Sequence, residues 1–125
     1  MVDLAALIAT VILLGLSIFQ LALIFGAPIG QFAWGGKNKV LPTKLRISSG
    51  ISIVFYGLFA LLALEGAGYV DVFLNDTFVS VALWVSFAYF LLGIFMNAIS
   101  RSRPERTLMT PVAAVLAICF FFIAQ

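Results

Sequence analysis

Four long apolar stretches limit what this chain of 125 residues can become. They run over about residues 4–25, 45–64, 78–99 and 104–124, and charged residues are scarce within them. A helix needs about 20 apolar residues to cross the hydrocarbon of a bilayer. Lipid also forces a single segment to satisfy its backbone hydrogen bonds internally. We therefore predict an all-α membrane protein, with four transmembrane helices that form one domain over residues 1–125.

The composition supports this fold class and removes several kinds of chemistry. Hydrophobic residues make up 64% of the chain and charged residues 10%, whereas roughly a quarter of the residues of a soluble domain are charged. There is no histidine, and Cys119 is the only cysteine, so histidine catalysis, histidine zinc sites and an internal disulfide are excluded. We expect no enzymatic activity, no bound metal and no cofactor.

The charged residues are divided between the two sides of the predicted membrane domain. All seven basic residues lie in or beside the first and third connections, and four of the five acidic residues lie near the N-terminus or in the second connection. Basic residues mark cytoplasmic loops. The pattern therefore predicts a plasma-membrane protein whose loops 26–43 and 100–106 are cytoplasmic, whereas both termini and loop 65–77 are extracytoplasmic. Alternate crossing gives an antiparallel up-and-down bundle.

Small and polar residues recur at steps of three and four along each stretch, which places them on one face of each helix. Several should meet near the cytoplasmic ends. Two interpretations are open: hydrogen bonds between helices, worth about 0.6 kcal/mol each, or a cavity that binds a small polar ligand or a lipid head group. The predicted polar cluster comprises Gln20, Ser49, Ser52, Tyr56, Tyr89, Asn97 and Thr110.

The first connection, PIGQFAWGGKNKVLP, contains a GGK that invites a phosphate-loop interpretation. A Walker A loop needs G-x-x-x-x-G-K-[ST] after a strand. Here Gly30 lies six residues before Gly36, and Asn38 replaces the hydroxyl residue, so we expect no nucleotide binding. The net charge of +2 is too small to indicate nucleic-acid binding. Instead, Pro28 should open a short interfacial helix, with Trp34 anchored among the lipid head groups. Whether this loop covers the polar cluster or lies beside it stays open.

The basic residues allow two explanations, which are topology alone or a specific site for anionic lipid or a partner. The protein partner would be a second copy or another membrane protein. Before the fourth stretch, Ser102 and Glu105 form a capping box that predicts a helix start near Arg103. The predicted lipid or partner face comprises Trp34, Lys37, Lys39, Lys44, Arg46, Arg101, Arg103 and Arg106.

Three segments, GAPIGQFAWGGKNKVLPTKLR, NAISRSRPER and MTP, resemble a family of small four-helix bacterial membrane proteins that are mostly uncharacterised. The resemblance implies a bacterial plasma membrane and supplies no activity or site residue. The leading hypothesis is a non-enzymatic membrane protein that acts through lipid or partner contacts at a basic cytoplasmic face. The alternative is a small oligomeric carrier or channel for a neutral or weakly polar solute. A proton-coupled pump is not expected, because such proteins usually carry an ionisable residue within a span.

Overall fold

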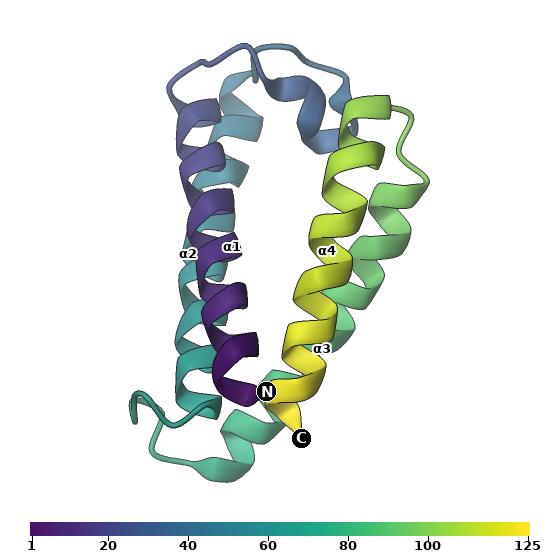
Figure 1. Cartoon of the computed structure of the whole chain (residues 1–125). Coiled ribbons are helices and arrows are strands. Elements are labelled where there is room, and N and C mark those ends of the chain that lie inside the picture. Colours follow the sequence, from purple (N-terminus) through teal and green to yellow (C-terminus); the bar gives the residue numbers. More distant parts are fainter.

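The computed structural model describes all 125 residues and contains only helices. The long helices are α1 (Val2–Ile24), α2 (Thr43–Gly66), α3 (Asp76–Ala98) and α4 (Arg103–Ala124). Two short 3-10 turns, η1 (Gly30–Phe32) and η2 (Trp34–Gly36), lie between α1 and α2 (Figure 1). All four long helices are long and apolar enough to cross a membrane, so the predicted fold class is confirmed. They indicate a multi-pass membrane protein.

The bundle consists of two helix pairs. α1 packs along α2 and α3 packs along α4, while α1 and α4 join the pairs and α2 and α3 touch only sparsely. The pairs lie close together at the end that holds both termini and stand apart at the other end (Figure 1). The end that holds both termini also carries loop 67–75, and we call it the acidic end. The other end carries loops 25–42 and 99–102, and we call it the basic end.

Small residues allow the close approach at the acidic end. Ala6 and Ala9 of α1 and Ala63 of α2 are fully buried, and Ala117 of α4 is nearly so. Without large side chains in the way, helix backbones can approach closely and gain van der Waals contacts that lipid does not replace. The core is therefore concentrated in this half of the bundle. Its larger buried members include Leu13, Leu62, Leu83, Phe90, Leu116 and Phe120.

The outer surface of the bundle is apolar. Leucine, isoleucine, valine and phenylalanine side chains of all four long helices are exposed, among them Leu14, Val54, Val85 and Ile118. A soluble monomer rarely leaves so much contiguous apolar surface uncovered. Lipid hydrocarbon is the solvent that suits these side chains.

The helix ends show where local sequence signals operate. α4 begins at Arg103 as predicted, and the Ser102 hydroxyl accepts the Glu105 N–H at 3.4 Å. In a complete capping box, the Glu105 carboxylate would also accept the Ser102 N–H. Here it accepts the N–H of Gly35 instead. At the acidic end, the Glu65 carboxylate accepts the N–H groups of Val72 and Phe73 at 2.7 and 3.0 Å. Carboxylates therefore hold a loop at each end of the bundle.

Another residue of the second connection interacts with the start of α1. Tyr69 is exposed, and its hydroxyl lies beside the Asp3 carboxylate. Hydrogen bonding to Asp3, followed by the charge of that carboxylate, raises the pKa of Tyr69 above its ordinary value. This contact brings loop 67–75 next to the N-terminus.

The single interfacial helix predicted in the first connection is wrong. The structure has two 3-10 turns separated by the extended residue Ala33. Trp34, Gly35 and Gly36 all have positive φ, at 53°, 77° and 71°. Such backbone conformations suit glycine and cannot continue a right-handed helix, so the chain reverses direction here.

The packing of α2 at the acidic end gives a matched pair of variants. A methyl group on Gly66 would lie 2.5 Å from Ile123 Cγ2 and 2.9 Å from Leu83 Cδ1, whereas one on Gly57 meets no atom within 4 Å. We expect Gly66→Ala to destabilise the bundle by about 1–3 kcal/mol through overpacking. Gly57→Ala should be neutral or stabilising, by up to about 1 kcal/mol. Thermal unfolding in detergent measures both, and equal midpoints for the two variants would contradict this packing.

Candidate functional site

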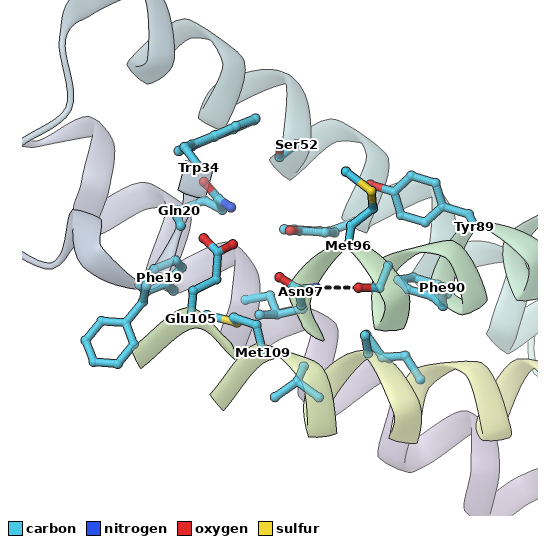
Figure 2. A pocket seen from close by; sticks show the side chains of 18 of the residues that line it. Phe19, Gln20, Trp34, Ser52, Tyr89, Phe90, Met96, Asn97, Glu105 and Met109 are labelled. Atoms are coloured by element: carbon cyan, nitrogen blue, oxygen red, sulfur yellow. Dashed lines mark hydrogen bonds between the residues drawn. The ribbon is translucent and has the colours of Figure 1, made fainter. Parts of the chain in front are cut away.

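A cavity of about 480 Å³ lies at the basic half of the bundle, between the two helix pairs (Figure 2). All four long helices and the first connection contribute to its wall. Gln20 comes from α1, Tyr56 from α2, Asn97 from α3 and Glu105 from α4. The remaining lining residues are Leu16, Phe19, Phe32, Ala33, Trp34, Gly35, Ser52, Tyr89, Phe90, Leu92, Gly93, Met96, Met109, Val112, Ala113 and Leu116.

Residues 32–35, here called the lid segment, cover one side of this cavity. The Trp34 indole Nε1 donates to Ser49 Oγ of α2 at 3.2 Å, and the Gly35 N–H donates to Glu105 Oε2 of α4 at 3.0 Å. Just before this segment, Ser102 Oγ donates to the carbonyl oxygen of Gln31. The first connection is thus attached to both helix pairs. Of the two arrangements left open by the sequence, it adopts the covering one.

Aromatic side chains close the cavity toward the acidic end. The ring centroids of Phe59 and Phe90 are 4.8 Å apart, and those of Phe90 and Phe120 are 5.2 Å apart in a stacked arrangement. Tyr89 lies 5.1 Å from Phe59 by the same measure. Below these rings, the buried alanine and leucine side chains fill the space between the helices. The cavity is therefore confined to one half of the bundle.

The cavity is open at its side. Tyr89, Leu92 and Met96 line it from α3 and remain 54%, 59% and 55% exposed. Ser52 and Tyr56 line it from α2, and α2 has far fewer contacts with α3 than with α1. Because a side of a membrane bundle faces lipid, a molecule could enter here directly from the bilayer.

Three polar side chains converge inside this cavity. Figure 2 shows Gln20, Asn97 and Glu105 reaching into the same space from three different helices. Gln20 and Glu105 are each only 6% exposed. Asn97 Nδ2 donates to the Gly93 carbonyl at 2.8 Å, which leaves its Oδ1 as a free acceptor. Gln20 Oε1 is buried and accepts no hydrogen bond.

Glu105 is a buried acidic residue without a cationic partner. Its carboxylate accepts the Gly35 N–H, and no lysine or arginine nitrogen lies within 4.0 Å of it. A buried carboxylate normally has a cation or several hydrogen-bond donors around it. Glu105 was not among the predicted site residues, since the capping box accounted for it. Its position as the only acid beside seven bases was the signal in the sequence.

The predicted stretch 104–124 includes Glu105, which is an ionisable residue at the start of an apolar helix. Glu105 belongs to the first turn of α4 and its side chain is buried in the bundle. Composition indicates where an apolar stretch begins. It does not reveal that a loop will cover the start of the helix and bury a charged side chain there.

The structure places five residues of the predicted polar cluster around this cavity and two elsewhere. The five are Gln20, Ser52, Tyr56, Tyr89 and Asn97. Ser49 is buried outside the lining and accepts from Trp34. The partly buried Thr110 does not line the cavity, and its hydroxyl oxygen is without a partner.

Hydrogen bonding between helices does not account for most of the cluster. Ser52 donates to the Ser48 carbonyl and Asn97 to the Gly93 carbonyl, both within their own helix. Ser17 and Ser86 do the same at 2.8 Å each. Gln20 is the exception, because its amide lies beside the Tyr56 hydroxyl. Ser52 and Asn97 therefore make no hydrogen bond between helices.

The basic residues of the predicted lipid or partner face lie at the basic end, and none forms an ion pair. Six of the seven are exposed and Arg46 is partly buried. Arg46 Nε donates to the Leu41 carbonyl at 2.8 Å, and an Arg106 guanidinium nitrogen donates to the Ser100 carbonyl at 3.0 Å. Trp34 is 40% exposed, and it is fixed to Ser49 rather than free. None of the seven bases lines the cavity.

A second cavity, of about 470 Å³, lies at the acidic end and includes Glu65, Asp71 and Asp76 among its lining residues. The Glu65 carboxylate is already engaged with loop 67–75. These carboxylates do not form a group that could hold a metal ion. Glu65 therefore serves to hold loop 67–75 at this end of the bundle.

Comparisons of the chain with protein-family models, with curated proteins and with solved structures found no match.

Two neighbouring glycines test the seating of the lid segment. Gly35 and Gly36 both have positive φ, so alanine strains each backbone by about 1–2 kcal/mol. A methyl group on Gly36 would also overlap Ser102 Cβ, whereas one on Gly35 meets nothing within 4 Å. We expect Gly36→Ala to open the loop more than Gly35→Ala does. Tryptic cleavage after Lys37 and Lys39 in detergent should be about tenfold faster for Gly36→Ala, if the overlap costs about 1.4 kcal/mol of local stability. Equal cleavage rates would show that this loop is not seated on Ser102.

Proposed function

We propose that this chain is a non-enzymatic, multi-pass protein of a bacterial plasma membrane, with its basic end in the cytoplasm, and that it acts by binding membrane lipid at that end. The observation that carries the proposal is the set of seven basic residues at one end of the bundle, none of them engaged in an ion pair. Such side chains remain available for lipid phosphates, each worth about 1 kcal/mol near an anionic surface.

The cavity supports lipid over a water-soluble partner. Its side opening between α2 and α3 lies on a helix surface that is apolar. A lipid tail can lie against such a surface while its head group reaches the polar side chains under the lid segment. A soluble ligand would instead have to displace the lid segment, which is bound to Ser49 and Glu105.

The second candidate is a carrier for a neutral or weakly polar solute, and the cavity itself favours it. Gln20 and Asn97 supply amide groups of the kind that bind such a solute. Passage to the acidic end would require the stacked rings of Phe59, Phe90 and Phe120 to separate. That packed floor favours binding over transport.

The proposed orientation can be tested with single cysteines in a Cys119→Ala background. Lys39 and Asp71 are exposed residues at opposite ends of the bundle. We expect a membrane-impermeant maleimide to label Asp71→Cys in intact cells, because the acidic end faces outward under the positive-inside rule. Lys39→Cys should react only after the membrane is permeabilised. The reverse labelling pattern would overturn the orientation.

Lipid binding at the basic end can be tested with a charge-neutralised variant. Arg101 and Arg103 are exposed and make no hydrogen bond through their side chains. We expect Arg101→Gln with Arg103→Gln to weaken binding of phosphatidylglycerol at least about tenfold, because two phosphate contacts are lost. Native mass spectrometry of detergent-solubilised protein with added phosphatidylglycerol measures this effect. Added salt should weaken binding by the wild-type protein as well.

The matched control removes two charges at the other end, with Asp71→Asn and Asp76→Asn. It should retain wild-type affinity for phosphatidylglycerol or bind slightly better. Equal affinity of the arginine variant and the wild type would refute lipid recognition by the basic face.

A further inference from the structure

Two hydrogen-bond acceptors in the cavity wall have no donor. Four of the donors in its wall are already used within the protein: Trp34 Nε1 by Ser49, the Gly35 N–H by Glu105, Asn97 Nδ2 by the Gly93 carbonyl and Ser52 Oγ by the Ser48 carbonyl. The acceptors are not matched in the same way, because Asn97 Oδ1 and Gln20 Oε1 take no donor. A ligand with N–H or O–H groups would supply the donors that these two oxygens lack.

The formal charge inside the cavity is negative. Glu105 is the only acidic residue in the lining, and no basic residue lines the cavity. Its carboxylate has one backbone donor, from Gly35, and no cation within 4.0 Å. A positively charged donor would compensate this buried carboxylate far better than a neutral one, because it adds the attraction of opposite charges to the hydrogen bond.

The walls are also suited to a cation. Aromatic residues line the cavity from α1, α2, α3 and the lid segment. Their ring faces attract an ammonium group within about 6 Å, most strongly where water is excluded. The aromatic lining residues are Phe19, Phe32, Trp34, Tyr56, Tyr89 and Phe90.

We infer that this cavity binds the primary ammonium group of an amphiphile, with Glu105 as its counter-ion and with Asn97 and Gln20 as its further acceptors. This inference rests on the proposed function, since it takes the ligand from the bilayer. A primary ammonium has three N–H donors, which match the three polar side chains. The Glu105 and Asn97 side chains reach into the same space (Figure 2), and rotation of the Gln20 amide would supply the third oxygen. The apolar part of the ligand leaves between α2 and α3.

Two kinds of molecule could supply a primary ammonium group on an apolar body. One is the ethanolamine head group of a phospholipid, whose phosphate would then face the arginines of the segment that carries Glu105. The other is a soluble lipophilic amine that partitions into the membrane. A quaternary ammonium has the same charge and no N–H donor. The comparison of phosphatidylethanolamine with phosphatidylcholine of identical acyl chains therefore isolates the hydrogen bonds.

Trp34 supplies the signal for the test, because it lines the cavity. The other tryptophan, Trp84, is replaced by phenylalanine in every protein used. Fluorescence of the full chain in neutral detergent is titrated with phosphatidylethanolamine, phosphatidylcholine, hexylamine and hexanol. We expect phosphatidylethanolamine to bind at least about tenfold more tightly than phosphatidylcholine, and hexylamine more tightly than hexanol by a similar factor, since each preferred ligand brings donors to a charged acceptor.

The deciding variant is Glu105→Gln, which keeps an oxygen for the Gly35 N–H and removes the charge. It should unfold at the same temperature as the wild type and lose both preferences to within about twofold. The matched control is Glu65→Gln, the same change at a carboxylate that holds the loop of the opposite end. It should keep both preferences. Asn97→Leu gives an independent reading, because the Asn97 side chain bonds only within its own helix. It should weaken phosphatidylethanolamine binding several-fold while the bundle stays folded.

The outcomes separate the possibilities. The site is supported if the wild type prefers phosphatidylethanolamine and hexylamine in their respective pairs and Glu105→Gln loses both preferences. The natural source is then the lipid if phosphatidylethanolamine binds more tightly than hexylamine. A preference for hexylamine alone supports the site with a soluble amine as its source. The inference is overturned if the wild type shows no preference in either pair, or if Glu105→Gln retains it. Binding of phosphatidylglycerol by the basic face would survive that result, so the proposed function is tested separately.

Discussion

The contact between Glu105 and the N–H of Gly35 joins the two halves of this bundle at the basic end. At the acidic end, α1 and α4 approach through small side chains and need no such tie. At the basic end the helix pairs stand apart (Figure 1), and the first connection bridges them by bonds to Ser49 on one side and Glu105 on the other. The cavity exists because the helices diverge, and it has a cover because this carboxylate holds the loop.

The polar residues of the helices carry out different tasks from those that their pattern indicates. A hydroxyl or amide that donates to the carbonyl four residues earlier is satisfied within its helix and contributes little to association. Ser52, Ser86 and Asn97 behave in this way. Association then depends on van der Waals packing of alanines and phenylalanines, concentrated in the acidic half. The basic half is consequently free to keep polar side chains that face a cavity rather than one another.

The sequence predicts where the four helices lie in the chain, but it does not predict which helices pack against each other. Hydrophobic length determines where a chain can cross a membrane, so the predicted stretch 78–99 and the helix Asp76–Ala98 nearly coincide. Pairing depends on which faces fit, and every stretch carries small residues that could serve. The predicted polar cluster included five lining residues because helical periodicity places them at one depth. Glu105 was missed because its role depends on a contact with Gly35, 70 residues away in the chain. The two 3-10 turns were missed because Trp34, not a glycine, begins the run of positive φ values.

The placement of charge at the basic end explains how a single chain can carry seven bases, six of them exposed, and one buried acid in so short a space. The bases lie in water or among head groups, where they are solvated and where anionic phosphate is their natural neighbour. The acid lies under the lid segment, out of reach of all seven, so no internal salt bridge neutralises either sign. A zwitterionic amphiphile can neutralise the bases and the buried acid together, because its phosphate stays at the surface while its ammonium group enters the cavity. Since its tail needs an apolar exit, the sparse contact between α2 and α3 becomes part of the same arrangement. The weakly packed side of the bundle is then the entrance to its site, and the lid segment lies against Glu105, which is only 6% exposed.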